Sequence, residues 1–364
     1  MTVKAAFVMS GAGVVRRGAE AFVLDLCRAL PALGVEPTLF CRGAVDVPHQ
    51  RIAALARDGR WLTGAYSATR FGRKVLDTAF LDPMNVEWAT AALSAAPKLA
   101  RGRFDVVVME GGLVGGWVGR VLRRLGGTKF VDIAHGIDPK WEGAFARNRP
   151  DRTVVFTRSF ANELERLAPS ARIEVIPHGV DLELFHPGAR QPPTDLERPL
   201  FLCVGHVDDH KQIDRTLEAV AALSKGSLVV LGEGPGAARL DSLATAMLGP
   251  SRYLRANVAR SELPGWYATA DCFTLASRTE SFGLVYTEAM ACNTPCVAPD
   301  DAVRREVIGE GGFYFPQGDP RAYSEALELA AAETWGDRPR RRAEQFPFSR
   351  TADAYANLFQ ELAR

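Results

Sequence analysis

Two glutamates separated by seven residues mark the stretch whose chemistry is easiest to interpret. Between Glu280 and Glu288 stand Ser-Phe-Gly-Leu-Val-Tyr-Thr, in which a glycine precedes an apolar run typical of a helix start. Backbone N–H groups at a helix start are unpaired and attract phosphate. A carboxylate one turn into the helix would repel phosphate, but it suits sugar hydroxyls. The stretch therefore predicts a site for a nucleotide or a nucleotide sugar.

A site of this kind needs a strand before it and a sheet around it, and the flanking sequence supplies both. Residues 271–277 are apolar enough for a buried strand. Near the N-terminus, a strand over 5–10, a glycine-rich loop, a helix over 21–33 and a strand over 37–41 follow one another. This alternation continues along the chain. It predicts an α/β protein with parallel sheets and with ligands beyond the carboxyl ends of the strands.

The first glycine-rich loop fits neither common phosphate-binding motif. The dinucleotide pattern G-x-G-x-x-G needs glycine where Arg16 stands. The P-loop needs Lys followed by Ser or Thr after Gly18, but Ala19 and Glu20 follow. The loop has the spacing of a phosphate cradle, so we expect it to line a ligand site. The alternative is that its glycines only make the turn.

Length and composition narrow the function classes. A chain of 364 residues predicts two domains, and a net charge of +1 argues against nucleic acid as the main partner. The six cysteines form no Cys-x-x-Cys pair, which suits free thiols in a reducing cytoplasm. The N-terminus reads as a first strand rather than a signal peptide, and no apolar stretch approaches the ~20 residues of a membrane span.

Two further segments affect the predicted organisation. Residues 57–80 interleave arginines and a lysine with aromatic residues, as in an acceptor or membrane-surface patch. A solvated helix face with buried aromatics is the alternative. Residues 186–194 hold three prolines and a glycine and are the clearest candidate for a linker. We therefore predict domains at 1–187, completed by a C-terminal helix at 348–364, and at 188–347.

Seven motifs follow one another along nearly the whole chain. They are Gly18-Ala-Glu20, His135-Gly136, Ile176 to Phe185, Val204-Gly205 followed by Lys211, Leu231 to Pro235, Glu280 to Glu288, and Glu306 to Phe313. In this order they resemble the retaining glycosyltransferases of group 1, or GT4 type. The resemblance implies the GT-B fold, in which two Rossmann-like doubly wound domains face a cleft. It also implies transfer of a sugar from a nucleoside-diphosphate sugar to an acceptor hydroxyl.

The resemblance assigns the donor to the C-terminal domain and the acceptor to the N-terminal domain. Glu288 would accept hydrogen bonds from ribose. Glu280, with the loop formed by Ser281, Phe282, Gly283 and Leu284, would hold the donor sugar and the diphosphate. The backbone near Arg255 would read the base.

The remaining implied roles concern charge and close approach. Lys211 would neutralise the diphosphate beside Gly205, and Gly18 would let the backbone approach it. His135 would lie by the donor sugar at the reaction centre. Structural alternatives stay open: a helix cap for Glu280, a solvated face for Glu288, and a structural or surface role for His135 and Lys211.

The chain departs from the family pattern in one loop that bears on catalysis. His206 stands where the family usually has an arginine paired with the lysine, and Gln212 replaces the usual glycine after that lysine. An imidazole is only partly charged near neutrality, whereas a guanidinium is always charged. His206 could be held protonated by the diphosphate, Arg16 or Arg17 could supply the charge instead, or activity could be reduced. A milder change puts His178 in the family's Pro-Asn-Gly turn.

These observations predict a metal-independent hexosyltransferase that uses no cofactor beyond its nucleotide-sugar substrate. No Asp-x-Asp triplet, the usual holder of a metal-bound diphosphate, occurs in the chain. Glycan, lipid-linked and natural-product acceptors all fit, and we expect a cytoplasmic protein, soluble or peripheral at the inner membrane face. The alternatives are a catalytically weak GT-B protein that binds nucleotide or a partner enzyme, and a nucleotide-sugar epimerase.

Overall fold

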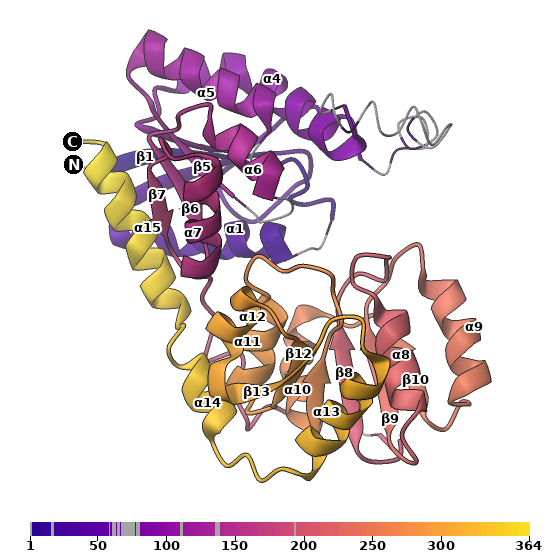
Figure 1. Ribbon diagram of the computed structural model, residues 1–364. Coiled ribbons are helices and arrows are strands. Elements are labelled where there is room, and N and C mark those ends of the chain that lie inside the picture. The colour runs from indigo at the N-terminus through magenta and orange to yellow at the C-terminus, as the bar shows by residue number, and fades with distance from the viewer. Residues whose placement is uncertain are drawn as a thin grey trace. The chain divides into compact units, whose positions relative to one another are not determined.

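The computed structural model describes residues 2–15, 18–57, 59, 63, 66, 77, 81–109, 112–134, 139–192 and 194–364, with only the backbone at 139 and 140. The chain forms two compact units (Figure 1). The first comprises Met1–Ile176 and Thr351–Arg364, and the second comprises Pro177–Arg350.

The division falls earlier than the predicted boundary after residue 187, because the intervening segment packs on the second unit. Phe185 is fully buried and contacts Tyr267 with ring centroids 6.0 Å apart. Arg340 Nη1 also donates to the Phe185 carbonyl at 2.9 Å. Part of the predicted linker packs on the same unit, since Gln191 Nε2 donates to the Ala268 carbonyl at 3.0 Å.

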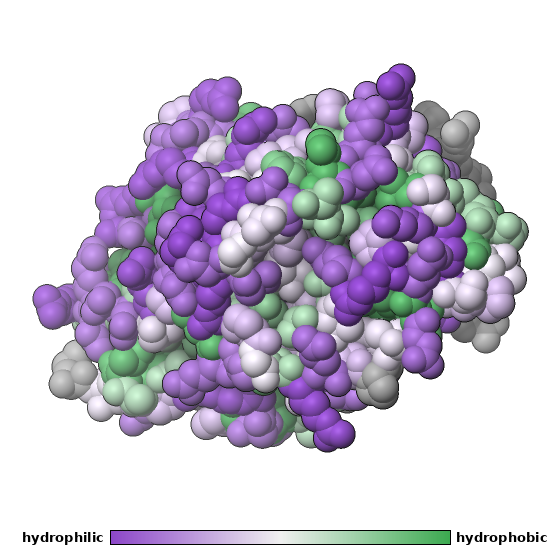
Figure 2. Space-filling model, turned by 90° about the horizontal axis from the view of Figure 1, so that it is seen from below, coloured by the Kyte–Doolittle hydropathy of each residue, from purple (hydrophilic) through white to green (hydrophobic). Residues whose placement is uncertain are grey.

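The face of the molecule that Figure 2 shows is mainly polar. In the view of Figure 2, hydrophilic residues predominate and hydrophobic ones form small, separate groups. Among the residues with a described position, no helix combines the length and the apolar character needed to cross a membrane.

The first unit is built on a parallel sheet with the order β3-β2-β1-β4-β5-β6-β7. The strands are β1 (Val3–Val8), β2 (Val35–Cys41), β3 (His49–Arg51), β4 (Val106–Met109), β5 (Lys129–Ile133), β6 (Arg152–Val155) and β7 (Ile173–Val175). The helices are α1 (Gly18–Ala29), α4 (Pro83–Gly102), α5 (Leu113–Gly126), α6 (Pro139–Ala146), α7 (Arg158–Leu167) and α15 (Phe348–Leu362). The strand order reverses between β1 and β4.

Alternation along β1 explains how helices cover both faces of this sheet. Ala6 and Val8 face the core that also holds apolar residues of α4 and α5. Phe7 points to the other face and meets Phe359 of α15, with ring centroids 5.9 Å apart. Figure 1 shows α4 and α5 side by side on one face and α15 near α1 on the other. The last helix therefore packs on the sheet of the first unit, as predicted.

Helix α4 was not assigned from the sequence, although its start carries a recognisable signal. The Asp82 side chain accepts hydrogen bonds from the N–H groups of Met84 and Asn85, at 3.0 and 3.2 Å. Pro83 follows as the first helical residue, where its missing N–H has no cost. Pro97 inside the helix hides the pattern, because an internal proline normally argues against a continuous helix.

The second unit has a parallel sheet with the order β10-β9-β8-β11-β12-β13. Its strands are β8 (Leu200–Val204), β9 (Ser227–Leu231), β10 (Tyr253–Ala256), β11 (Cys272–Thr274), β12 (Cys296–Pro299) and β13 (Gly312–Phe315). Its helices are α8 (Ile213–Ala221), α9 (Ala237–Met247), α10 (Leu263–Thr269), α11 (Leu284–Ala291), α12 (Ala302–Ile308), α13 (Pro320–Ala332) and α14 (Arg338–Ala343). The strand order reverses between β8 and β11, and the predicted α/β class with parallel sheets is confirmed.

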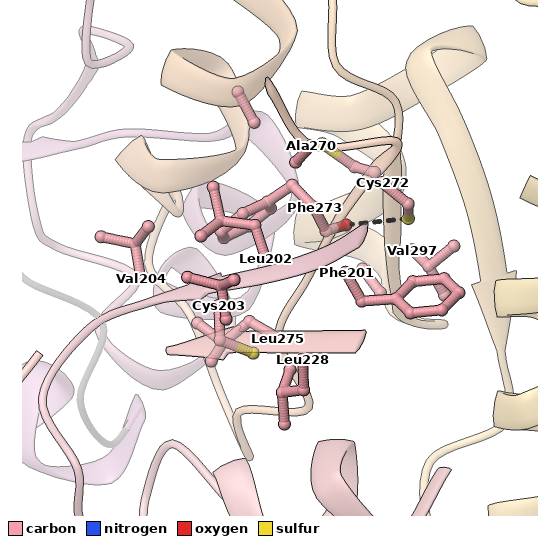
Figure 3. Packing of buried hydrophobic residues seen from close by; sticks show 14 of the residues in the cluster. Phe201, Leu202, Cys203, Val204, Leu228, Ala270, Cys272, Phe273, Leu275 and Val297 are labelled. Atoms are coloured by element: carbon pink, nitrogen blue, oxygen red, sulfur yellow. Dashed lines mark hydrogen bonds between the residues drawn. The ribbon is translucent and has the colours of Figure 1, made fainter. Parts of the chain in front are cut away.

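The core of this unit fixes the two central strands beside each other. Side chains of β8 and β11, among them Phe201, Leu202 and Phe273, pack together with Leu228 of β9 and Val297 of β12 (Figure 3). Residues of β8 are buried on both faces, as expected for a central parallel strand. The loops that leave the carboxyl ends of β8 and β11 are therefore held at a fixed spacing.

Candidate functional site

Two loops meet at the point where the second sheet reverses its strand order. One follows β8 and runs from Gly205 to Gln212, and the other follows β11 and leads to α11. The Arg278 N–H donates to the His210 carbonyl at 2.9 Å, and His210 Nε2 lies 3.0 Å from the Thr279 carbonyl oxygen. In open α/β sheets, ligands bind in the crevice at this reversal.

Glu280 is held by groups from both loops. Its Oε1 accepts hydrogen bonds from Lys211 Nζ and from Ser277 Oγ, each at 2.7 Å. Burial by itself raises the pKa of this carboxyl, but the charge and hydrogen bond of Lys211, with Ser277 and Arg304, bring the pKa below its usual value. Within the described part of the chain, Oε2 accepts no hydrogen bond. That oxygen remains available to a hydroxyl group.

Arg304 of α12 holds Ser277, the residue that donates to Glu280. Its side chain is fully buried, and Nη2 donates to the Ser277 carbonyl at 2.6 Å and to Ser277 Oγ at 2.8 Å. The guanidinium also pairs with Asp301, which caps α12 by accepting from the Arg304 N–H. Because Ser277 in turn donates to Glu280, Arg304 fixes the orientation of the carboxylate without touching the open edge of the sheet.

The start of α11 has the geometry that the sequence predicts. Gly283 is the N-cap residue with φ +84°, which a residue with a side chain adopts only with strain. No side chain of the described chain caps this end, so the first N–H groups stay open to an anion. Phe282 anchors the loop, with its ring 5.6 Å from the His178 ring and 5.5 Å from the Phe346 ring. Ser281 and Leu284 flank this turn and are partly exposed.

Glu288 lies on the second turn of α11 and is partly exposed. Its Oε2 accepts a hydrogen bond from the Tyr267 hydroxyl at 2.9 Å. Burial, reinforced by the charge of Glu288, raises the pKa of Tyr267 well above its usual value, so the hydroxyl keeps its proton and acts as the donor. The helix therefore presents backbone N–H groups at its start and a fixed carboxylate one turn later.

Two predicted residues, one on the first of these loops and one on β10, do not join the Glu280 cluster. His206 is exposed and forms no hydrogen bond with the described part of the chain. Arg255 is occupied elsewhere: Nε and Nη2 donate to the two carboxylate oxygens of Asp241 at 2.8 and 2.7 Å. Its Nη1 lies 3.3 Å from the Gly232 carbonyl, so Arg255 braces the end of β9.

Gly205 is approached closely by the backbone that follows β9. A Cβ on Gly232, which follows β9, would lie 1.9 Å from the Gly205 carbonyl oxygen. Both glycines have positive φ, 155° and 158°. The ends of β8 and β9 can therefore approach each other only with glycine at Gly232.

Predicted residues of the first unit can be followed only in part. Gly18 is described and is the first residue of α1. His135, Arg16 and Arg17 lie outside the described residues, as does most of the basic and aromatic stretch 57–80. Among the residues with described positions, no three His, Cys, Asp or Glu side chains gather in a way that could hold a metal ion.

Four residues of the site were not identified as site residues from the sequence. One of them, His178, was noted only as part of a turn. Ser277, Arg304 and Tyr267 contact the two glutamates directly or through one neighbour. His178 is 5% exposed and packs on Phe282. Among these residues, only Arg304 has a recognisable local signal in the sequence, because it follows the helix N-cap Asp301 by three residues.

Comparison with known proteins places both halves of the chain in glycosyltransferase families. The model described as "Glycosyl transferases group 1" matches residues 189–345, and "Glycosyltransferase Family 4" matches residues 16–184. In structure, the chain is similar to a sucrose-phosphate synthase from Thermosynechococcus elongatus, with a TM-score of 0.80, 22% identity and coverage of 100% of this chain and 99% of that one. At this identity the likeness shows the shared GT-B fold.

Two curated relatives cover most of the chain. A GDP-mannose-dependent alpha-(1-6)-phosphatidylinositol dimannoside mannosyltransferase from Mycobacterium tuberculosis is 30% identical, with 80% of this chain and 77% of the relative covered. A D-inositol 3-phosphate glycosyltransferase from Kineococcus radiotolerans is 29% identical, with 94% of this chain and 90% of the relative covered. The chain belongs to the GT4-type, group 1 glycosyltransferases with the GT-B fold, and it transfers a glycosyl group from a nucleotide sugar to an acceptor.

Proposed function

We propose that this enzyme is a retaining glycosyltransferase that needs no metal ion and binds its donor in the second unit. The observation that carries the proposal is the joint position of three groups at the strand reversal. The uncapped start of α11, the Lys211–Glu280 pair and Glu288 all lie on the loops and helix that leave β8 and β11. Phosphate, sugar and ribose each have a partner there.

The donor would be held by a division of labour. The open N–H groups at the start of α11 receive the diphosphate, with Lys211 as the neighbouring cation. Glu280 Oε2 accepts from hydroxyls of the donor sugar, and Glu288, steadied by Tyr267, accepts from the ribose hydroxyls. His206 is exposed on the same loop as Lys211, so it can donate a hydrogen bond to the bound diphosphate.

The reaction then requires stabilisation of the departing diphosphate. Its bond to the anomeric carbon breaks as the acceptor oxygen approaches from the same face of the sugar, and the acceptor proton passes to a phosphate oxygen. N–H dipoles and a cation aimed at the leaving group lower the barrier. This route needs no protein nucleophile, and His135 is proposed to lie by the donor sugar. The absence of an Asp-x-Asp triplet supports transfer without a metal.

The names of the relatives guide the choice of acceptor. One relative acts on a phosphatidylinositol dimannoside and the other on D-inositol 3-phosphate. We therefore propose an acceptor with an inositol or inositol-phosphate moiety, free or lipid-borne, and GDP-mannose as one donor to include in the screen.

A donor screen followed by a product analysis tests the proposal. UDP-, GDP-, ADP-, TDP- and CDP-sugars are compared by thermal shift, because a bound ligand stabilises the native state by mass action. The best donor is incubated with inositol 3-phosphate and with a phosphatidylinositol mannoside, with and without EDTA. We expect a product with the donor's anomeric configuration, formed equally in EDTA.

Each other outcome identifies a different error. An inverted anomer contradicts the retaining mechanism, and loss of turnover in EDTA contradicts metal independence. Nucleotide binding without transfer or donor hydrolysis favours a binding protein with weak catalysis. Conversion of the donor into an epimeric nucleotide sugar favours an epimerase.

A further inference from the structure

Exposed apolar side chains are concentrated on one part of the first unit. Among the described residues, ten large hydrophobic side chains are exposed, and five of them lie between residues 81 and 125. These five are Leu81, Leu93, Leu113, Trp117 and Leu125. Single exposed apolar residues are ordinary, but a concentration on neighbouring elements marks an interaction surface.

Three of these five side chains lie along two adjacent helices, whereas Leu81 precedes α4 and Leu125 lies at the end of α5. On α5, Leu113 is 38% and Trp117 53% exposed, and Arg120 and Arg124 continue the same face at three- and four-residue intervals. On α4, Leu93 is 52% exposed. The two helices pack along each other, and Figure 1 shows them side by side. We call the surface formed by Leu93, Arg101, Leu113, Trp117, Arg120 and Arg124 the α4–α5 face.

The charge on this face has one sign. The only carboxylate in α4 and α5 is Glu87, which is 1% exposed. Glu87 accepts from Ser10 Oγ at 2.8 Å and from Arg57 Nε at 2.7 Å, so it belongs to the interior. By contrast, the side chains of Arg101, Arg120 and Arg124 form no hydrogen bond or ion pair with any described residue. The α4–α5 face is therefore apolar and cationic without a balancing acid.

The direction of the helices orders these groups along the face. Both helices flank β4, one before and one after it, so both begin at the carboxyl edge of the sheet and end at its amino edge. Leu113 opens α5 at the carboxyl edge, where ligands of this fold bind. Arg101 and Arg124 lie toward the other end. Leu113 and Trp117 thus stand near the edge at which an acceptor would be met. Leu93 lies midway along α4, and Leu125 lies with Arg124 at the far end of α5.

We propose that the α4–α5 face docks on an anionic lipid bilayer. Tryptophan and leucine side chains suit the interfacial region, and arginine side chains pair with lipid phosphates. A protein partner would need a matching acidic and apolar surface, whereas an anionic bilayer offers both features everywhere. The inference goes beyond the proposed function. It depends on that function only in suggesting that a lipid-borne acceptor is met at this edge.

Vesicle co-sedimentation without donor or acceptor tests the inference on the full chain. Vesicles of phosphatidylcholine with phosphatidylglycerol are compared with vesicles of phosphatidylcholine alone, at low and high salt. One variant is Leu113→Ser with Trp117→Ser, and a second is Arg120→Gln with Arg124→Gln. The matched control is Leu329→Ser, which removes a leucine that is 62% exposed on α13.

We expect the native protein to bind only the anionic vesicles and to be released by salt. The double arginine variant should bind roughly 25-fold more weakly, since each basic residue near such a surface contributes about five-fold. The double apolar variant should lose binding at any salt, and Leu329→Ser should behave as the native protein. Transfer to a water-soluble acceptor should be unchanged in all three, which shows that they are folded.

Three results would overturn the inference: no binding by the native protein, equal binding by all variants, or salt-independent binding to uncharged vesicles. Self-association that sedimentation velocity detects in the native protein, and that Trp117→Ser abolishes, would also overturn it, because the face would then be covered by a second copy. None of these results bears on nucleotide binding, so the proposed function is tested separately.

Discussion

Glu280 is ionised although its side chain is only 11% exposed. Its folded-state pKa is lower than its ordinary value of about 4.5, because Lys211, Ser277 and Arg304 outweigh the opposing effect of burial. A carboxyl whose pKa is lowered by folding stabilises the folded state above its unfolded pKa, and this contribution is lost as the pH falls through the folded pKa. Glu280 therefore links the stability of the second unit to acid.

We expect Glu280→Gln to lower the free energy of unfolding at pH 7 by about 1–3 kcal/mol, since Lys211 loses its charged partner in a partly buried site. The deficit should shrink as the pH falls below about 4.5 and through the lowered pKa of Glu280, because the native carboxyl is then protonated as well. Urea unfolding of the native protein and the variant across this pH range measures the difference in unfolding free energy. A deficit that stays constant with pH would show that shape, rather than charge, is responsible. Glu325→Gln, which breaks an exposed pair with Arg321, should have little effect at any pH.

Glu288 offers a test of the ribose assignment. Replacing it by Gln removes a charged acceptor, so nucleoside diphosphates should bind roughly 10- to 100-fold more weakly by calorimetry. Inorganic diphosphate, which has no ribose, should bind as before. Tyr267→Phe should cause a smaller loss, because it leaves the carboxylate in place but frees its orientation. Equal weakening of nucleotide and inorganic diphosphate would assign Glu288 to the phosphate site instead.

At the scale of elements, the approach of β8 to β9 depends on Gly232. The alanine Cβ would overlap the Gly205 carbonyl, and neither backbone can move without displacing a central strand. We expect Gly232→Ala to destabilise the second unit by more than about 3 kcal/mol. Gly318→Ala is the control, because Gly318 also has positive φ, +89°, but no atom lies within 4 Å of its Cβ. The free energy of unfolding of Gly318→Ala should fall by only about 1–2 kcal/mol. Similar losses in both variants would show that backbone strain at positive φ, rather than the clash with Gly205, destabilises Gly232→Ala.

The loop before α8 contains the opposite case, a residue where glycine would fit better. Gln212 is the N-cap of α8 with φ +49° and makes no side-chain capping bond. Gln212→Gly should raise the free energy of unfolding by about 0.5–1 kcal/mol, since the left-handed strain exceeds the entropy that glycine adds to the unfolded chain. Asn293→Gly, at φ +64°, should gain less because asparagine tolerates this conformation. A loss in Gln212→Gly would mean that its side chain supports the neighbouring Lys211.

The sequence predicts those parts of the site that are local in the chain. Glu280, Gly283 and Glu288 share one strand–loop–helix segment, so spacing and turn chemistry were enough to place them. Their partners could not be found in this way. Tyr267 and Arg304 stand 21 residues before Glu288 and 27 residues after Ser277, and only the packing of α10 and α12 brings them near. The same holds for Arg255, whose partner Asp241 lies on the preceding helix.

At the scale of the whole molecule, each unit has its own core, and the last helix belongs to the first. Phe359 is fully buried and meets both Phe7 and Tyr355 at 5.9 Å. We expect two calorimetric transitions, of which a bound nucleoside diphosphate raises only that of the second unit. Phe359→Ala should destabilise the first unit by about 3–5 kcal/mol and leave the nucleotide-sensitive transition in place. Phe273→Ala, which empties a buried position between β8 and β12, should do the reverse. If both variants shift a single transition, the units unfold together, and the stability gained from bound nucleotide then extends to the first unit.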